Sequence, residues 1–156
     1  MELKEAIILV IVIMVFTVIV TILKGRGKKG IGYVSMTFHE MFHFKVGILK
    51  VDGSRQFSMV VENSSDVDVV IKDMYLEIKN GTRYEKQTLP ASSFDNTKEM
   101  IIPSGKSGAA FLSMKEFKKY LNGQTILKAV AEDDSGKAFK SKIMQIDPSN
   151  MKLELK

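Results

Sequence analysis

The feature that most constrains this chain is an unbroken apolar run at residues 6–23, AIILVIVIMVFTVIVTIL, in which only Thr17 and Thr21 carry polar side-chain atoms. As an α-helix rising about 1.5 Å per residue, the run would extend about 27 Å, close to the roughly 30 Å hydrocarbon core of a bilayer. A helix is required there because lipid offers no partners for free backbone amides and carbonyls. The run therefore predicts a transmembrane anchor at residues 1–23, which holds the rest of the chain at a membrane.

A cleaved signal peptide is the main alternative for the same run. Signal peptides have a basic start, an apolar stretch of roughly 7–15 residues and a small-residue cleavage site. Here Met1–Glu5 carries more acidic than basic side chains, the run is longer, and no such cleavage pattern follows it. These differences favour an uncleaved anchor over an unusual signal peptide or a buried core helix.

The charged residues beside the run predict its orientation. Lys and Arg gather on the cytoplasmic side of membrane helices. Only Lys4 precedes the run, whereas four basic residues follow it in a glycine-rich linker at residues 24–32. These membrane-flanking residues are Lys24, Arg26, Lys28 and Lys29. We therefore expect a single-pass protein of the cell membrane with its C-terminal domain in the cytoplasm, and the same basic residues can also contact anionic lipid headgroups.

Composition limits what the remaining residues can do. The formal net charge is +5, but Lys alternates with Asp or Glu, as at Lys72-Asp73, which is typical of a solvated surface and not of a nucleic-acid-binding face. Cysteine is absent, which excludes disulfides, thiolate metal sites and a cysteine nucleophile. No cofactor is indicated. Asn63-Ser64-Ser65 and Asn80-Gly81-Thr82 match the N-glycosylation pattern, and each also fits a plain turn.

After the linker the hydrophobic pattern changes to a period of two, which is typical of β-strands. Apolar residues of one parity run from Val34 to Ile48, with a bend expected near Glu40. Further strands, separated by turns such as Asp52-Gly53, are predicted at residues 57–62, 67–78, 83–89, 100–102, 109–112, 125–131 and 137–146. The polar residues 83–89 suit the edge of a sheet, where charge discourages pairing with other chains.

One helix is predicted inside this β-rich region. Ser113 can accept a hydrogen bond from the Glu116 amide while the Glu116 carboxylate reaches back to the Ser113 amide, which is a capping box. The apolar face of this helix would comprise Met114, Phe117, Tyr120 and Leu121. These elements predict a mainly β fold, an antiparallel immunoglobulin-like β-sandwich at residues 33–147 with one short helix, preceded by the transmembrane helix. Residues 148–156 form a C-terminal tail that either frays or adds a short terminal element.

Several stretches carry a resemblance to a known group of proteins. They are the basic-flanked anchor, FSMVVENSSDVDVVIKDMYLEIKNG at Phe57–Gly81, Leu89-Pro90, IPSGKS at Ile102–Ser107 and AVAEDDSGKAFKSK at Ala129–Lys142. In this order they resemble uncharacterised bacterial single-pass membrane proteins with an immunoglobulin-like domain. The resemblance implies a domain that binds or positions a partner, and it supplies no catalytic residues. It does not extend to residues 38–44.

Residues in this unmatched stretch carry the one catalytic motif of the chain. His39-Glu40-Met41-Phe42-His43 fits H-E-x-x-H, in which two histidines bind zinc and the glutamate activates water in metallopeptidases. The motif works on a helix, where side chains four residues apart have Cβ atoms about 5–6 Å apart, whereas on a strand the pair is about 13 Å apart. The period-two pattern favours a strand, although Val34, Phe38, Met41 and Phe42 also fit a helical stripe.

The sequence offers few residues that could serve as the third protein ligand of such a zinc site. A catalytic zinc needs three protein ligands, and with two histidines and no cysteine the third would be a carboxylate. The carboxylates available for this role are Asp66, Asp68 and Glu77. The alternatives are two solvent-facing strand histidines or a weak, non-catalytic metal site.

Three further patterns have simpler interpretations. Ser104-Gly105-Lys106-Ser107 resembles the end of a phosphate-binding P-loop, but Met100 stands where the first glycine belongs, so we predict a turn. Asp133-Asp134-Ser135 could offer oxygens to calcium, but the later Glu of a calcium loop is missing, so we predict a hairpin loop. The methionines are predicted to fill the core, among them Met36, Met41, Met59, Met74 and Met144.

These observations leave three hypotheses about function. The first is a membrane-anchored, non-enzymatic binding or scaffolding protein that presents its domain to a protein partner, through the edge at residues 83–89 or loop tips such as residues 133–137. The second is a membrane-tethered zinc metallopeptidase that uses His39, Glu40 and His43. The third makes the anchor the active part, by association with other membrane helices, but the run contains no Gly-x-x-x-Gly pair.

Overall fold

The computed structural model describes residues 32–156, so the predicted anchor, its basic flank Lys24, Arg26, Lys28 and Lys29, and most of the linker lie outside the described residues. Between residues 32 and 156, no helix has the length and apolar character needed to cross a membrane. This part of the chain is mainly β, with antiparallel sheets and one short α-helix, as the period-two pattern predicts.

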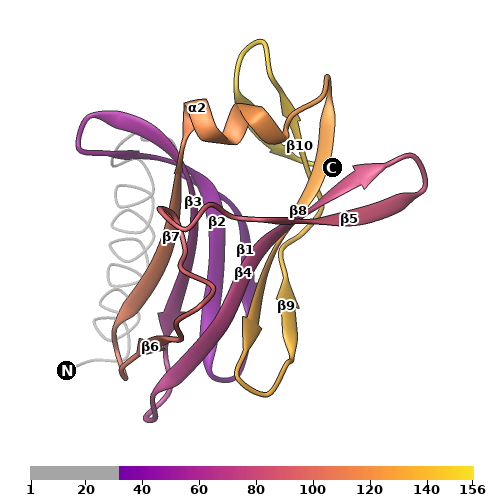
Figure 1. Ribbon diagram of the computed structural model, residues 1–156. Helices are drawn as coiled ribbons and strands as arrows, with labels where there is room; N and C mark the ends of the chain where they lie inside the picture. The colour runs from indigo at the N-terminus through magenta and orange to yellow at the C-terminus, as the bar shows by residue number, and fades with distance from the viewer. Residues whose placement is uncertain (1–31) are drawn as a thin grey trace, which may run out of the picture. The chain divides into compact units, whose positions relative to one another are not determined.

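The strands form two antiparallel sheets (Figure 1). The first has the order β1-β2-β3-β7 and comprises β1 (Tyr33–Phe38), β2 (Phe42–Val51), β3 (Ser54–Asn63) and β7 (Ser107–Ser113). The second has the order β11-β10-β8-β4-β5 and comprises β11 (Lys152–Leu155), β10 (Met144–Asp147), β8 (Thr125–Asp133), β4 (Val69–Asn80) and β5 (Arg83–Thr88). Beside this path, β6 (Met100–Ile102) pairs with β4 and β9 (Ala138–Lys140) pairs with β8.

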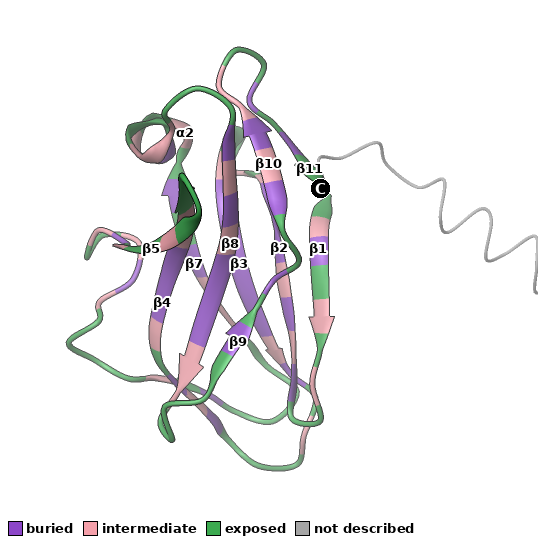
Figure 2. Ribbon diagram, turned by 90° about the vertical axis from the view of Figure 1, so that its right-hand side faces the viewer, coloured by how far each residue is buried: buried purple, intermediate pink, exposed green. Residues whose placement is uncertain are grey.

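A single hydrophobic core lies between the two sheets and explains the alternating pattern. Phe44 of β2 and Phe57 of β3 enter this core from the first sheet, and Ile71 of β4 and Leu127 of β8 enter it from the second. Because successive side chains of a strand point to opposite faces, alternate residues enter this core, and in β3 the residues between them, Ser58 and Val60, are buried as well. Buried positions accordingly recur along β3, β4 and β8 in Figure 2.

The β2–β3 hairpin turns where Asp52-Gly53 predicts it. Val51 pairs with Ser54, so the connection has two residues, with φ of 48° at Asp52 and 84° at Gly53. Positive φ at both central positions is the geometry that suits the twist of a hairpin and that Asp-Gly tolerates. The prediction of this turn is confirmed.

The polar strand β5 lies at the edge of the second sheet, as its charges predict. Its partner, which the sequence left open, is the second half of β4, from Tyr75 opposite Thr88 to Asn80 opposite Arg83. The first half of β4 pairs with β6 instead. On this edge, β4 therefore pairs with β6 along its first half and with β5 along its second half.

Contacts between the sheets close both sides of the domain. On one side, the Thr37 hydroxyl donates to the Lys140 carbonyl at 3.2 Å and the Lys142 amide donates to the Ser35 hydroxyl at 3.0 Å. On the other side, β6 packs so closely on β7 that a Cβ at Gly108 would lie 2.8 Å from Ile102 Cδ1. These contacts fix the two sheets to each other and make them a rigid scaffold for the loops.

The predicted helix is present and begins with the predicted capping box. Helix α2 (Met114–Phe117) has the Glu116 amide donating to the Ser113 hydroxyl and the Ser113 amide donating to the Glu116 carboxylate, both at 3.2 Å. It continues as the 3₁₀ helix η1 (Lys118–Tyr120). Phe117 is fully buried and stacks on Phe57 at 4.2 Å between ring centroids, which holds the helix over the end of the sheets (Figure 1).

The strand predicted at residues 137–146 and the C-terminal tail at residues 148–156 have structures that the sequence did not determine. The strand predicted at residues 137–146 is interrupted between β9 and β10. In this interval the Ser141 hydroxyl accepts from the Ala129 amide at 2.9 Å, and the Lys142 amide donates to the Ser35 hydroxyl of β1. The C-terminal residues do not fray. They form β11, which pairs with β10 and buries Leu153.

Candidate interaction site at the four-loop end

The H-E-x-x-H residues lie in a tight turn and at the start of a strand, not on a helix. β1 ends at Phe38 and β2 begins at Phe42, and residues 39–41 connect them, with the His39 amide donating to the Phe42 carbonyl at 2.9 Å. Glu40 is exposed at the tip of this turn. The strand predicted over this range, with a bend near Glu40, is instead two antiparallel strands that turn at residues 39–41.

The two imidazoles make contacts on different sides of the hairpin. His39 packs edge-on against Phe139 of the second sheet, at 4.5 Å between ring centroids, and its Nε2 lies 3.2 Å from Lys137 Nζ. His43 packs edge-on against Phe38 at 4.8 Å, and its Nδ1 lies 3.9 Å from a Glu62 carboxylate oxygen on the first sheet. The Lys137 ammonium therefore places a positive charge beside Nε2, which disfavours a metal cation at that nitrogen.

This arrangement does not provide the geometry of a zinc peptidase. The helix that would bring His39 and His43 together is not formed, and the candidate third ligand Glu77 is paired with Lys140 at 2.6 Å. No three His, Cys, Asp or Glu side chains between residues 32 and 156 lie close enough together to hold a metal ion. In the structure, the motif therefore forms a turn, and His39 and His43 each pack against a phenylalanine ring.

Glu62 takes part in the one ion pair beside His43. Lys45 of β2 donates a hydrogen bond to the Glu62 carboxylate of β3. This hydrogen bond and the Lys45 charge lower the pKa of Glu62 below its ordinary value. The pair keeps Glu62 ionised, and the strand residues around it are part of the first sheet's outward face.

Two of the loops at this end of the domain, and the end of β6, are joined by Asn63, the last residue of β3. Its side chain is 1% exposed, donates to the carbonyls of Val67 at 2.7 Å and Ile102 at 2.8 Å, and accepts from the Ser65 amide at 2.9 Å. Its backbone amide donates to the Lys106 carbonyl at 2.9 Å. The N-glycosylation interpretation of Asn63 is therefore wrong, because its amide nitrogen is buried and fully hydrogen-bonded.

The β1–β2 turn is attached to the same group of loops. The Ser64 amide donates to the Met41 carbonyl at 3.1 Å, and the Ser104 hydroxyl donates to the Ser65 carbonyl at 2.7 Å. The residues around Ser104 form a turn before β7, so the predicted turn is confirmed and no helix follows it as a P-loop would require.

The β8–β9 loop closes on itself through Asp133. One Asp133 carboxylate oxygen accepts from the Ser135 hydroxyl at 2.6 Å, the Ser135 amide at 3.0 Å and the Lys137 amide at 2.9 Å. Burial raises the pKa of Asp133, but these hydrogen bonds outweigh it and hold the pKa below its ordinary value. With three donors on one oxygen, the loop is the predicted hairpin loop. Its contact to the β1–β2 turn is the one between Lys137 and His39.

We call this group of connections the four-loop end. It comprises residues 39–41 between β1 and β2, 64–68 between β3 and β4, 103–106 between β6 and β7, and 134–137 between β8 and β9. All four lie at the lower end of the domain in Figure 1, opposite α2. Most of their residues are exposed, as Figure 2 shows.

Large apolar side chains are exposed in and beside these loops. Phe38 is 66% exposed, Ile101 61%, Val67 57% and Met41 39%. The period-two pattern placed Phe38 and Met36 on the inward parity, but β1 turns them outward, because Ser35 and Thr37 of β1 contact the second sheet. The prediction that methionines fill the core is confirmed for Met59, Met74 and Met144 and is wrong for Met36 and Met41.

A hollow of about 310 Å³ lies between three of the loops. Its apolar lining comes from Met41, Phe42, Val69 and Val70. Its polar lining comes from Asp68, Asp133, Asp134 and Ser135. The hollow therefore combines an apolar surface with three carboxylates, two of them on loops and one, Asp133, at the end of β8.

Comparison with known proteins identifies no family for this chain. Neither the models of known protein families nor the curated proteins match the sequence. A function for this chain is therefore inferred from the site itself.

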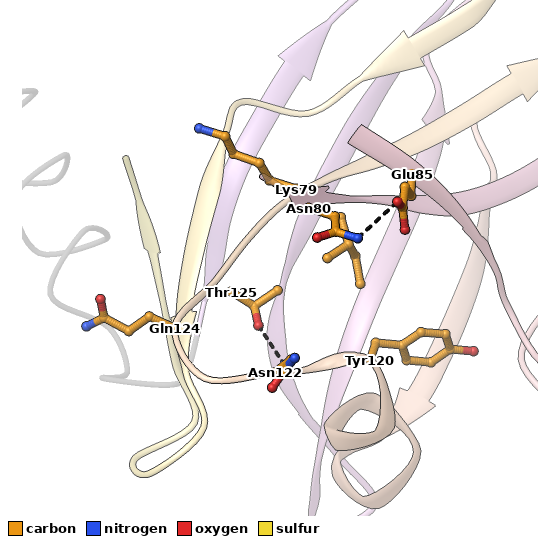
Figure 3. Close-up of a pocket in the computed structure, with 8 residues that line it drawn as sticks. Lys79, Asn80, Glu85, Tyr120, Asn122, Gln124 and Thr125 are labelled. Carbon is orange, nitrogen blue, oxygen red and sulfur yellow. Dashed lines mark hydrogen bonds between the residues drawn. The ribbon is translucent and has the colours of Figure 1, made fainter. Parts of the chain in front are cut away.

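A second hollow, of about 270 Å³, lies at the other end of the domain, between the β4–β5 hairpin and residues 120–125 (Figure 3). Its polar groups are largely committed to each other. Asn80 donates to Glu85 at 3.0 Å, the Tyr120 hydroxyl donates to the Thr88 carbonyl at 3.1 Å, and Thr125 accepts from the Asn122 amide at 3.1 Å. Lys79 and Gln124 both extend to the left in Figure 3, away from Glu85 and Tyr120, so this hollow lacks a convergent set of polar groups.

Proposed function

We propose that the chain is a membrane-anchored, non-enzymatic binding protein whose immunoglobulin-like domain presents the four-loop end to a protein partner. The observation that carries this proposal is the exposure of Phe38, Met41, Val67 and Ile101 at one end of the domain. Large apolar side chains gathered on a surface mark interaction sites in soluble domains. Loops held by a rigid scaffold are where binding residues are most often found.

The strand connections support an immunoglobulin-like arrangement of the domain. The chain crosses from the first sheet to the second after β3, returns to pair β7 with β3, and crosses again to pair β8 with β4. Such pairing of strands that are not consecutive is the Greek-key pattern of immunoglobulin-like sandwiches. In antibody variable domains, loops clustered at one end of the sandwich form the binding site.

The anchor gives the proposal its location. The apolar run at residues 6–23 and the basic residues after it support a single-pass protein of the bacterial cell membrane with its domain in the cytoplasm. Gly32, where the described residues begin, precedes β1, whereas the four-loop end begins after β1. The length of β1 (Tyr33–Phe38) therefore separates Gly32 from the turn at residues 39–41.

The proposal is tested by recovering partners with the full chain from membranes. Cells expressing the tagged full chain are treated with a chemical cross-linker, the membranes are dissolved in detergent, and recovered proteins are quantified by mass spectrometry. We expect a specific membrane or cytoplasmic protein whose recovery falls about tenfold or more with Val67→Asp, since loss of a central apolar contact costs 2 kcal/mol or more.

Ile143→Asp is the matched control, because Ile143 is another exposed large apolar residue but lies between β9 and β10. It should recover the partner as the unchanged chain does. If no protein is specifically recovered, or if both variants lose it equally, the proposed function is wrong.

A further inference from the structure

We infer that the hollow at the four-loop end binds a partner segment that places an aliphatic side chain next to a lysine or arginine. This inference rests on the proposed function and specifies the chemistry of the partner. It follows from two properties of the hollow, its apolar surface and the sign of the charges around it.

The apolar surface suits an aliphatic side chain. Met41 is 39% exposed at the mouth, while Phe42 and Val69 are almost fully buried, so the hollow has an accessible rim and a closed floor. At about 310 Å³ it lies at the lower end of ligand-site volumes, which suits one or two side chains and not a large cofactor. Met is unbranched and flexible, so it can adjust to the shape of what enters.

The charge around the hollow has one sign. Asp68 and Asp134 make no hydrogen bond or ion pair with any residue in the range 32–156, and one oxygen of Asp133 is free of the three donors that hold the other. Lys137, on the same loop, acts on Asp133 through its charge, and its ammonium lies 3.2 Å from His39 Nε2 and over the Phe139 ring. A basic group from a partner would supply a counter-charge to Asp68 and Asp134.

Carboxylates on another face of the domain are paired with lysines. On the outward face of the second sheet, Lys86 pairs with Asp73 and Lys140 pairs with Glu77, each at 2.6 Å. Those carboxylates already have their cations. The unpaired carboxylates at the hollow also disfavour anionic lipid headgroups and nucleic acid, which leaves a basic and aliphatic protein segment as the complementary occupant.

Short peptides test this inference on the full chain in nanodiscs. The probes are capped Gly-Lys-Leu-Lys-Gly, with Gly-Glu-Leu-Glu-Gly and Gly-Lys-Ser-Lys-Gly as references, and binding is followed by backbone amide NMR shifts. We expect only the first peptide to shift the signals of Met41, Val69, Val70 and Ser135. The double substitution Asp68→Asn with Asp134→Asn should weaken its binding roughly five- to tenfold, since exposed charge pairs contribute little each, and added salt should do the same.

Glu85→Gln is the control, because it removes one exposed carboxylate from the β4–β5 hairpin and should leave binding unchanged. The inference is overturned if the reference peptides bind equally well, if the Asp substitutions leave the affinity unchanged, or if the shifts map elsewhere. Those results would leave the proposed function standing wherever partner recovery still depends on Val67. Failure of partner recovery, with the peptide result intact, would overturn the proposed function instead.

Discussion

Among single residues, Asn63 has the largest structural role at the proposed binding end. Its buried side chain bonds to two carbonyls and a Ser65 amide, and its backbone bonds to the β6–β7 turn. Nothing in the sequence distinguishes this asparagine from Asn80, because both sit in polar turns. Only the pairing of β3 with β7 and the position of β6 bring the Ile102 carbonyl within its reach.

Asn63→Ala should lower the free energy of unfolding by about 2–3 kcal/mol, because it leaves buried carbonyls without donors. Urea unfolding of the full chain in detergent, followed by tyrosine fluorescence, measures this. Asn80→Ala is the control and should change stability by less than about 0.5 kcal/mol, since Asn80 is exposed. Equal effects of the two substitutions would contradict the role assigned to Asn63.

Glu62 makes a prediction about pH. Its pKa is lowered by Lys45, so the pair stabilises the folded state above the unfolded-state pKa, and this contribution is lost as pH falls through the lowered folded-state pKa. In Lys45→Met, the carboxyl carbon titration of Glu62 should move upward toward its ordinary value. The Asp147 pKa, which hydrogen bonds from Ser149 lower, should not move. An unchanged Glu62 titration would show that the Lys45 pair is absent in solution.

His39, Glu40 and His43 give the prediction that separates the two functional hypotheses. Purified full-length protein should contain no stoichiometric zinc by elemental analysis, and Glu40→Gln should not change the zinc content, because the two imidazoles contact different sheets. Stoichiometric zinc that is lost in His39→Ala would instead support the metal site.

At the scale of elements, short sequence motifs predicted those features that depend on neighbouring residues in the chain. The Asp52-Gly53 turn, the capping box at Ser113 and the polar edge strand β5 are all confirmed, because each depends on residues adjacent in sequence. The break between β9 and β10 could not be predicted in this way. It depends on the hydrogen bond that the Lys142 amide donates to Ser35 of β1, which is distant in the chain, and the pairing of β11 likewise depends on the position of β10.

Ser113→Ala should destabilise the domain by about 1 kcal/mol, the usual cost of losing an N-cap, because the Glu116 amide then loses its hydroxyl acceptor. Thermal unfolding of the full chain measures the change. Ser107→Ala, at the exposed start of β7, is the control and should have little effect. A stability unchanged by Ser113→Ala would mean that packing of Phe117 alone holds α2.

At the scale of the whole molecule, the sequence predicted the sheets and left the binding surface undefined. The loop at residues 133–137 was among the candidate contact tips, but its neighbours were not, because the four-loop end is assembled from segments that the strand order brings together. Phe38 was expected on the inward parity, and its 66% exposure follows from the way β1 contacts the second sheet. An alternating pattern shows two faces and does not show which face a partner covers.

The central claim is that the four-loop end contacts a protein partner at the membrane. Site-specific photo-cross-linking in cells tests it most directly, with a photoreactive phenylalanine placed in the full chain at Phe38 or Val67, and at Tyr84 on the β4–β5 hairpin as the control. We expect a discrete cross-linked product with the same partner from Phe38 and Val67, and none from Tyr84. Cross-links from Tyr84 alone, or none from Phe38 and Val67, would contradict it.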